Sequence, residues 1–219
     1  MAKNSKRIDW FEKETELKLK PGKEYDLSDV SITTDNKMLL TDLLTLYVYT
    51  DCKYYEQRLH FPAVVTLPGE NSIQFVNTKS MTKGDKVNIG FTWYGITAGR
   101  EMIYVGGTHG SIQTLDNNGT ILKSFQQESE GAPVYSKNVS GLAGLACDRQ
   151  GNIYYGGFFD SNINRMTSNW KNCEEMINEE DGIEYPYGMC FNNDFTKLFV
   201  INNDSNSVYV YKCKHMMNC

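Results

Sequence analysis

The clearest structural pattern in this chain is the stretch Ala143-Gly-Leu-Ala-Cys-Asp-Arg-Gln-Gly-Asn-Ile-Tyr-Tyr-Gly-Gly157. It contains two short apolar runs that favour strands, separated by the polar turn Asp148 to Gly151. A second loop, Gly157 to Asn162, leads to a third run, Ile163 to Met166. The stretch therefore predicts an antiparallel unit in which short strands are joined by tight polar turns.

The same plan recurs along the chain with a period of about 45 residues, which is typical of propeller blades. Two further units are clear and two are weaker; they span 94–125, 187–211, 30–60 and 63–76. The clear units share one order of elements: an apolar strand, a polar turn, a second apolar strand, a Gly/Asn loop and a strand that alternates apolar and polar residues. The sequence therefore predicts an all-β fold, a β-propeller of about five blades.

The ends of the chain predict how the ring closes. The last unit stops after its third strand, near Lys212, and Glu16 to Lys20 alternates polar and apolar residues. We expect this N-terminal stretch to supply the outer strand of the last blade; the alternative is a short amphipathic helix over Trp10 to Lys20. The predicted organisation is a flexible segment 1–15, a propeller 16–214 and a tail 215–219.

Composition favours a strand-rich domain over a helical bundle or a membrane protein. The 219 residues are 40% hydrophobic, and no apolar stretch approaches the length of a membrane span. The 27 Asp and Glu outnumber the 22 Lys and Arg, so the chain lacks the basic excess of a dedicated nucleic-acid-binding domain. Residues 174–184 carry six acids and no base, which we interpret as a solvated loop because the spacing of a calcium loop is absent.

The cysteines indicate a reducing compartment. Six of them lie at positions 52, 147, 173, 190, 213 and 219, and none is spaced as in a zinc-binding CxxC motif. Cys213, His215 and Cys219 include soft metal ligands, but we expect an irregular tail there and no metal site. The start of the chain shows no apolar run typical of a signal peptide. We therefore expect reduced thiols, no cofactor and a cytoplasmic protein.

The unit at 143–157 resembles an NHL repeat, in which Gly and apolar residues, a polar turn ending in Gly, and an Asn-apolar-Tyr strand follow one another. Other phrases look like the C-terminal propeller of tripartite-motif (RING, B-box, coiled-coil) proteins, in particular the set found in bivalve molluscs. These phrases are Lys20-Pro-Gly-Lys-Glu-Tyr-Asp-Leu-Ser-Asp-Val30, Val65-Thr-Leu-Pro-Gly-Glu70 and Cys190-Phe-Asn-Asn-Asp-Phe-Thr-Lys-Leu-Phe-Val200. The resemblance covers residues 16–214 and implies a propeller that selects substrates for an E3 ubiquitin ligase.

The chain departs from that family in three respects. The family's propeller usually has six blades, which need about 240–270 residues, so 219 residues fall short by about a blade. The unit at 63–76 lacks an inner strand before Ala63, and residues 126–138 form a polar connector where a whole blade is expected. The sequence contains no RING or B-box motif, so we expect no ligase activity and no other catalysis from its own residues.

A propeller carries its function in the loops at its ends. Two loop sets should share one face: those that enter the inner strands and those that join each second strand to its third. They bring together large aromatic and polar side chains, which suit protein recognition. The candidate binding residues are Trp93, Tyr94, His109, Phe158, Phe159, Tyr185, Tyr187 and Asn203. The alternative is packing between blades, above all for Tyr94 and Tyr187, which each precede Gly in equivalent positions.

The sequence leaves two other functions open. Single-stranded RNA binding is known among NHL propellers, and Lys83, Lys86 and Arg100 would supply a local basic patch. A lactonase-like enzyme would hold a divalent metal in the central channel, but the inner strands carry mainly Ile, Leu, Met, Ala, Thr and Cys rather than oxygen ligands. No histidine stands at motif spacing from a nucleophile. We therefore expect a protein partner, and no DNA or membrane partner.

Overall fold

In the computed structural model the chain folds as an all-β protein. The structure describes residues 11–18, 27–32, 38–42, 46–49, 63–67, 70–77, 82–90, 93–99, 102–107, 111–125, 142–157, 161–202 and 207–214. In this part of the chain no helix is long and apolar enough to cross a membrane.

The described strands form five antiparallel sheets, which we number along the chain. Sheet 1 contains β2 (Leu27–Ile32), β3 (Met38–Asp42) and β4 (Leu46–Tyr49), and sheet 2 contains β5 (Ala63–Leu67), β6 (Ser72–Asn77) and β7 (Thr82–Asn88). Sheet 3 contains β8 (Trp93–Gly99), β9 (Met102–Gly107), β10 (Ile112–Asp116) and β11 (Ile121–Phe125). Sheet 4 contains β12 (Leu142–Cys147), β13 (Ile153–Gly157), β14 (Asn162–Met166) and β15 (Cys173–Asn178). Sheet 5 contains β16 (Pro186–Phe191), β17 (Lys197–Asn202), β18 (Ser207–Cys213) and the N-terminal β1 (Phe11–Lys18).

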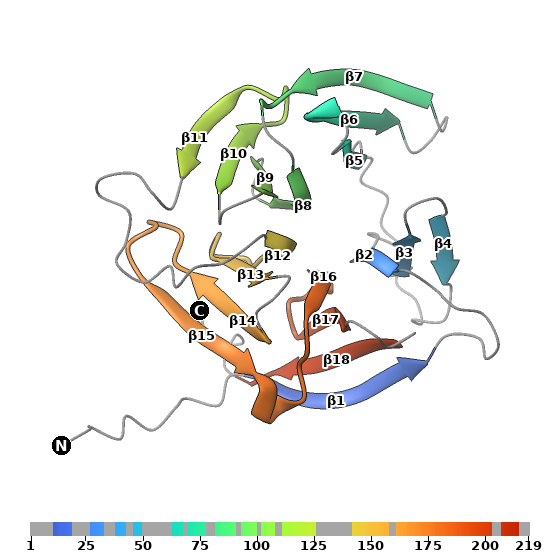
Figure 1. The fold of residues 1–219 in the computed structure, drawn as a ribbon, viewed down its shortest axis with the longest axis vertical. Helices are drawn as coiled ribbons and strands as arrows, with labels where there is room; N and C mark the ends of the chain where they lie inside the picture. The colour runs from blue at the N-terminus through green and yellow to red at the C-terminus, as the bar shows by residue number, and fades with distance from the viewer. Residues whose placement is uncertain are drawn as a thin grey trace.

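Figure 1 shows the five sheets arranged around a common centre. The first strands of neighbouring sheets pack directly on one another: β8 on β12, β12 on β16, and β16 on β2. These strands therefore line the inside of the ring, and the later strands of each sheet lie progressively farther out. The arrangement confirms the predicted β-propeller, with five sheets among the described residues.

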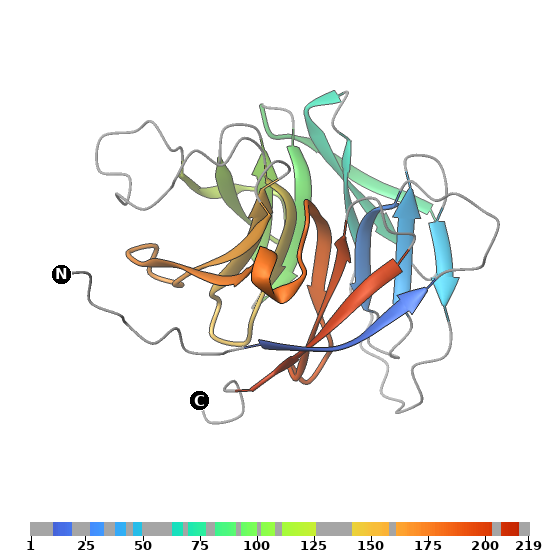
Figure 2. The same cartoon turned by 60° about the horizontal axis from the view of Figure 1, so that its bottom comes forward.

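Strand β1 confirms that the N-terminal stretch closes the ring as a strand and not as a helix. It pairs antiparallel with β18, with Phe11 opposite Cys213, and Figure 2 shows it lying along β18 at the outside of sheet 5. The predicted boundary between a flexible segment 1–15 and the propeller is wrong, because β1 already begins at Phe11. Phe11 is buried and packs edge-on against Tyr154 of sheet 4. This burial attaches the first half of β1 to the core.

The pairing register identifies the place of each strand in its sheet. In sheets 3, 4 and 5 the first and second strands pair with an irregularity near the start of the first strand. The second and third strands pair regularly, and the third and fourth pair with a bulge. In sheet 2, β5 and β6 pair regularly, whereas β6 and β7 pair with a bulge. Strands β5, β6 and β7 are therefore the second, third and fourth strands of a blade.

Packing between sheets leads to the same assignment. The second strand of a blade packs on the inner strand of the next blade, as β9 does on β12, β13 on β16 and β17 on β2. Strand β5 packs on β8 in the same way. Among the described residues sheet 2 shows its second, third and fourth strands, and the segment before Ala63, which the sequence predicts to lack an inner strand, lies outside them. Sheet 1 has its first three strands, and residues 50–60, the end of the predicted unit 30–60, lie outside the described residues.

The hydrophobic core is divided among the junctions between sheets. Buried side chains of sheets 2 and 3 form one cluster, those of sheets 3 and 4 a second, those of sheets 4 and 5 with β1 a third, and those of sheets 5 and 1 a fourth. Tyr154 belongs to the third cluster, and its fully buried ring contacts Phe191 edge-on with the centroids 4.9 Å apart. Each of these four junctions is thus a separate apolar interface that holds two neighbouring sheets together.

Two outer strands were not predicted from the sequence. Strand β7 exposes nearly all of its side chains, so it carries no apolar alternation. Strand β15 lies in the acidic run 174–184, and our interpretation of that run as a solvated loop is wrong for this strand. Met176 and Ile177 are adjacent and both buried, because the pairing of β14 with β15 shifts register there and breaks the period of two. The connector 126–138 and the tail 215–219 lie outside the described residues.

Candidate functional site

Sheets 1, 3, 4 and 5 each have one end at which the inner strand begins and the second strand finishes. Trp93 at the start of β8 pairs with Gly107 at the end of β9, and Pro186 of β16 pairs with Asn202 of β17. Sheet 4 is built in the same way. The starts of these inner strands therefore lie beside the ends of the second strands, at one end of the propeller. We name this end of the propeller the loop face and the opposite end the turn face.

The structure describes part of the predicted binding set. Tyr185 and Tyr187 are described with their side chains, whereas only the backbone of Trp93 and Tyr94 is described, at the start of β8. The remaining members lie outside the described residues: His109, Phe158, Phe159 and Asn203. Because Trp93 and Tyr185 both stand where an inner strand begins, the structure places their backbones on the loop face.

Tyr185 combines an exposed ring with a strained backbone. Its side chain is 39% exposed, and its φ of 44° lies in the left-handed region that few non-glycine residues adopt. The preceding amide, the N–H of Glu184, donates to Oδ1 of Asn202 at 2.7 Å, and Pro186 restricts the backbone that follows. Such strain persists only where the surroundings enforce it, and it occurs frequently at functional sites.

Asn202 is a site residue that was not predicted from the sequence. It ends β17, is 4% exposed, and supports the backbone before Tyr185 through its side-chain oxygen. The equivalent positions in sheets 3 and 4 are glycines, Gly107 and Gly157. When the repeat units are aligned, the third unit carries an asparagine where the other two carry glycine, and this difference could have identified Asn202 as a site residue.

The loop that leads into β16 is held at both ends. A capping box surrounds the 3-10 turn η3 (Glu179–Asp181): Oδ1 of Asn178 accepts from the N–H of Glu180 at 3.0 Å, and Oδ2 of Asp181 accepts from the N–H of Asn178 at 2.9 Å. Ile183 is fully buried in the cluster of sheets 4 and 5. The exposed residue Tyr185 thus stands on an anchored loop.

The same loop makes this part of the loop face acidic. Glu179, Glu180 and Glu184 are exposed, and all three shortly precede Tyr185 in the sequence. Clustered carboxylates attract basic side chains and repel phosphate groups. The negative charge of the loop before β16 therefore attracts a basic segment more readily than a nucleic acid.

Close backbone packing makes a firm base beneath this loop. A Cβ on Gly144 would lie 1.9 Å from the carbonyl oxygen of Tyr187, and a Cβ on Gly156 would lie 2.6 Å from Cγ of Pro186, so only glycine fits at either position. The side chain of Tyr187 is half-buried against the cluster of sheets 5 and 1. Tyr187 therefore packs between blades, which was the alternative reading, and belongs to the base rather than to the exposed surface.

The turn face repeats one construction. In each turn the N–H of the first residue donates to the carbonyl of the last, and the N–H of the fourth donates to the carbonyl of the first. The described turns of this type are Asp116–Thr120, Asp148–Asn152, Thr167–Asn172 and Asn192–Lys197. Their fourth residues all have positive φ: Gly119, Gly151, Trp170 and Phe195. This uniform geometry points to a structural role.

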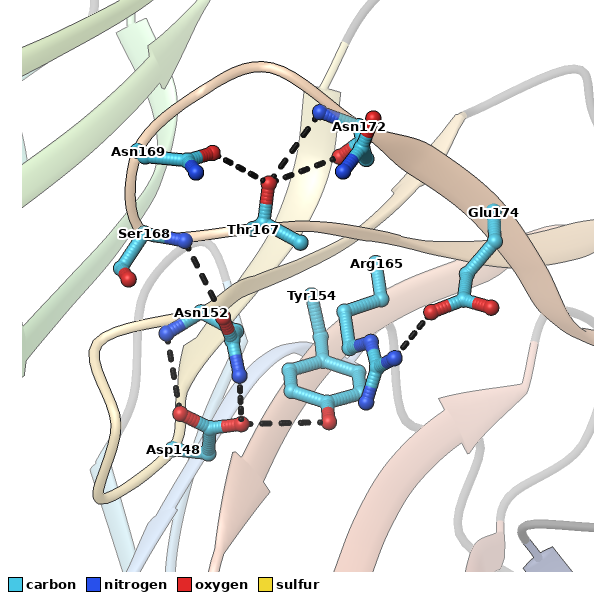
Figure 3. Close-up of polar contacts among 9 residues, drawn as sticks. All are labelled: Asp148, Asn152, Tyr154, Arg165, Thr167, Ser168, Asn169, Asn172 and Glu174. Atoms are coloured by element: carbon cyan, nitrogen blue, oxygen red, sulfur yellow. Dashed lines mark hydrogen bonds and ion pairs between the residues drawn. The ribbon is translucent and has the colours of Figure 1, made fainter.

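Figure 3 shows the buried polar network at the turn face of sheet 4. Asp148 is 3% exposed; its Oδ1 accepts from the N–H of Asn152 at 2.9 Å, and its Oδ2 accepts from Nδ2 of Asn152 at 2.8 Å and from the Tyr154 hydroxyl at 3.3 Å. Burial, and next the Asp148 carboxylate, raise the pKa of the Tyr154 phenol. Arg165 lies beside that hydroxyl and pairs with Glu174. These groups satisfy one another and hold the turn in place.

Metal and thiol chemistry can be assessed for the described residues. Among them, no three His, Cys, Asp or Glu side chains are grouped so as to hold a metal ion. The four described cysteines, Cys147, Cys173, Cys190 and Cys213, are free thiols. Burial raises the pKa of the Cys213 thiol to about 12, so this group stays protonated and unreactive at neutral pH.

The comparisons with known proteins concern the fold. No protein-family model matches the chain, and no curated protein matches it in sequence. Among solved structures, a streptogramin B lyase has a TM-score of 0.53 at 14% identity, over 89% of this chain and 67% of that one. The glutaminyl cyclase of Myxococcus xanthus has a TM-score of 0.67 at 7% identity, over 92% of this chain and 95% of that one. At such low identity the similarity shows a shared β-propeller fold and nothing about activity.

Proposed function

We propose that the chain is a non-catalytic recognition module that binds a protein partner through the loop face of the propeller. The observation that carries this proposal is Tyr185, an exposed aromatic ring at a left-handed backbone position on an anchored loop. Aromatic residues contribute most to protein interfaces when their backbone is held in place, since little entropy is then lost on binding. The proposed set extends from Tyr185 across the loop face to Trp93, which stands at the equivalent inner-strand start of sheet 3.

Charge supports a protein partner with a basic segment. Glu179, Glu180 and Glu184 are exposed on the loop that carries Tyr185, so a Lys- or Arg-bearing segment would gain electrostatic attraction as its apolar side chains contact the ring. The same carboxylates oppose single-stranded RNA, whose binding needs a positively charged groove. Of the basic patch considered from the sequence, Lys83 and Lys86 lie on the outer strand β7, and Lys86 pairs with Glu70.

The NHL and tripartite-motif resemblance extends this proposal to a biological role. In a tripartite-motif relative that carries a RING, the propeller would select substrates for an E3 ubiquitin ligase, and the propeller of this chain would bind the same class of target. We place it in the cytoplasm, a proposal supported by the free thiols of its described cysteines. We propose no cofactor, no DNA partner and no membrane partner.

The experiment compares tagged wild-type protein with a loop-face variant and a turn-face variant. Tyr185→Asn with Trp93→Ala removes both rings, and Asn tolerates the left-handed backbone at 185. Asn117→Ala changes an exposed residue of the turn face and is the matched control. Partners retained by the wild type and by the control, but not by the loop-face variant, are purified and their affinity is measured by calorimetry. We expect the double change to weaken binding about a hundredfold, as loss of two aromatic contacts predicts.

The alternatives are separated by two further measurements on the same protein. A gel shift of single-stranded RNA at physiological salt, lost in the loop-face variant, would replace the protein partner by RNA. Hydrolysis of a lactone that depends on an added divalent metal would replace the binding module by an enzyme. Equal partner recovery by all three proteins would refute the assignment of the loop face.

A further inference from the structure

Strand β1 is held to sheet 5 by its main chain, one buried ring and a few charged contacts. Of its side chains that the structure describes, Phe11 is buried, Glu16 and Leu17 are half-buried, and the others are exposed. By contrast β15, the outer strand of sheet 4, buries both Met176 and Ile177. Local opening costs least where little apolar surface is buried, so β1 should open at a lower free energy than the propeller unfolds.

Opening of β1 would leave the remaining strands of sheet 5 paired. Strands β16, β17 and β18 follow one another in the sequence and pair in that order, whereas β1 precedes β2 of sheet 1. Figure 2 shows β1 lying along the outside of β18. Once β1 leaves, the main-chain donors and acceptors that it pairs with, from Ser207 to Cys213, become an edge on which another strand can pair.

The apolar contact of β1 defines one requirement of this edge. Phe11 lies opposite Cys213 and belongs to the buried cluster of sheets 4 and 5. Its ring packs edge-on against Tyr154 with the centroids 6.1 Å apart. A small side chain at this position would leave a cavity, so the edge favours a strand with an aromatic residue opposite Cys213.

The charged contacts of β1 define a second requirement. Oε2 of Glu12 lies 3.5 Å from Nζ of Lys214. Oε2 of Glu14 lies 2.7 Å from Nζ of Lys197. Exposed ion pairs of this kind add little to stability, but they favour one sign of charge in whatever occupies the edge. The preferred strand therefore carries carboxylates at the first and third positions after its aromatic residue.

We propose that the outer edge of β18 is a strand-docking site, which β1 covers in the free protein and an extended segment of a partner protein occupies in trans. The segment pairs antiparallel with β18, inserts its aromatic ring beside Tyr154 and directs its carboxylates to Lys214 and Lys197. Because β1 must open first, the apparent affinity is proportional to the fraction of molecules in which β1 is open. This site is separate from the loop face and does not depend on the function proposed there.

A labelled peptide that copies Phe11–Lys18 is the probe, because the contacts of β1 show how this sequence fits the edge. It should bind the 219-residue chain in a saturable manner, measured by fluorescence anisotropy. Phe11→Ala in the peptide should weaken binding at least about tenfold. Phe11→Ala in the protein should instead strengthen binding, because the competing strand is then held less tightly. Weaker binding to that protein variant, or no binding to the wild type, would overturn the proposal.

Charge selection is tested with a peptide that carries Glu12→Lys and Glu14→Lys. This peptide should bind the wild type about tenfold more weakly than the original, and it should prefer a protein with Lys197→Glu and Lys214→Glu. Lys83→Glu with Lys171→Glu, two exposed lysines of other sheets, is the control for net charge and should leave the order of the two peptides unchanged. Equal binding of both peptides to the wild type would overturn the acidic pattern.

A reversible lock tests the displacement of β1 without weakening its hold. Glu12 and Lys212 lie opposite one another and are both exposed, so Glu12→Cys with Lys212→Cys allows a disulfide between β1 and β18. Oxidation should abolish peptide binding and reduction should restore it. Equal binding by the oxidised and reduced forms would refute the displacement. A dimer by light scattering that dissociates on peptide addition would assign the edge to a second copy and overturn the partner proposal.

Discussion

Three aromatic residues with left-handed backbones distinguish the two faces of the propeller. On the turn face, Trp170 has φ of 63° and Phe195 has φ of 62°, and a cation of the neighbouring sheet lies over each ring. Lys123 Nζ is 4.3 Å from the Trp170 centroid, and the Arg149 guanidinium is 5.5 Å from that of Phe195. On the loop face, Tyr185 has the same backbone strain but a 39% exposed ring. A left-handed aromatic residue thus packs its ring against the neighbouring blade on the turn face, whereas on the loop face it exposes its ring to solvent.

The two faces therefore suit different roles, stability on the turn face and the proposed recognition on the loop face. The turn face repeats one hydrogen-bonded turn, and its side chains contact the adjacent blade. The loop face has no repeated construction among the described residues, and its loop before β16 uses a capping box and the side chain of Asn202 instead. Changes on the turn face should therefore lower stability and leave binding intact. Loss of the exposed ring of Tyr185 should instead weaken the proposed binding at little cost in stability, and changes that disturb its supporting loop should do both.

The largest effect on stability is expected for Asp148→Ala. The change leaves the backbone donor of Asn152 and the Tyr154 hydroxyl without their buried charged acceptor, so the free energy of unfolding should fall by about 3 kcal/mol. Asp116→Ala is the matched control, because Asp116 accepts equivalent hydrogen bonds in an open turn and should cost clearly less. Urea unfolding followed by tryptophan fluorescence measures both. Equal losses would show that burial of the network adds nothing to the turn.

Asn202→Ala should have the next largest effect, now on the loop face. The amide of Glu184 loses its acceptor, and the free energy of unfolding should fall by about 1.5 kcal/mol. Because this hydrogen bond supports the backbone before Tyr185, hydrogen exchange at Glu184 should accelerate more than at Asn152 on the turn face. An even acceleration over both faces would contradict a local support of the Tyr185 loop.

The repeat pattern was sufficient to predict the ring. Inner and second strands alternate apolar residues around polar turns, so 143–157 and its relatives indicate a propeller, and antiparallel order alone fixes which loops share a face. Outer strands carry less of this signal. In β7 nearly all side chains are exposed, so apolar and polar residues do not alternate. In β15 a register shift breaks the alternation. In β1 the buried ring of Phe11 lies before the alternating part of the strand.

The candidate site was predicted less completely, for a different reason. The sequence places both Tyr185 and Tyr187 in the candidate set and offers packing between blades for Tyr187 only as an alternative. Their separation into an exposed ring and a packed ring depends on the backbone angle at Tyr185 and on the distance of Tyr187 from Gly144, which belongs to another sheet. Neither quantity is local in the sequence. The contribution of Asn202 likewise arises only when β17 is placed beside the loop before β16.

Glycine substitutions test how much backbone strain each face tolerates, with expected losses in the free energy of unfolding of about 1 kcal/mol. Gly151 on the turn face and Gly182 on the loop face have φ of 82° and 83°, and an added Cβ would meet nothing closer than 3.6 Å at the first and nothing within 4 Å at the second. Gly151→Ala and Gly182→Ala should therefore each cost about 1 kcal/mol, from backbone strain alone. Gly119→Ala should cost more, since its Cβ would lie 2.6 Å from Cγ2 of Val87. Thermal unfolding gives the order, and a smaller loss at Gly119 than at Gly151 would contradict it.

The smallest effect is the acid sensitivity of the open turn at Asp116. The hydrogen bond from the N–H of Thr120 is the main cause that holds the pKa of this carboxyl below its ordinary value. The folded state thus favours the ionised form, so the stabilisation is complete above the unfolded pKa of about 4 and is lost as the pH falls through the lower folded pKa. Asp116→Asn keeps an acceptor oxygen but cannot titrate, and should lose less stability than the wild type between neutral pH and about pH 3. Urea unfolding at both pH values measures the difference. Identical acid dependence in the two proteins would show that this turn, though built like that at Asp148, contributes no charge-dependent stability to the turn face.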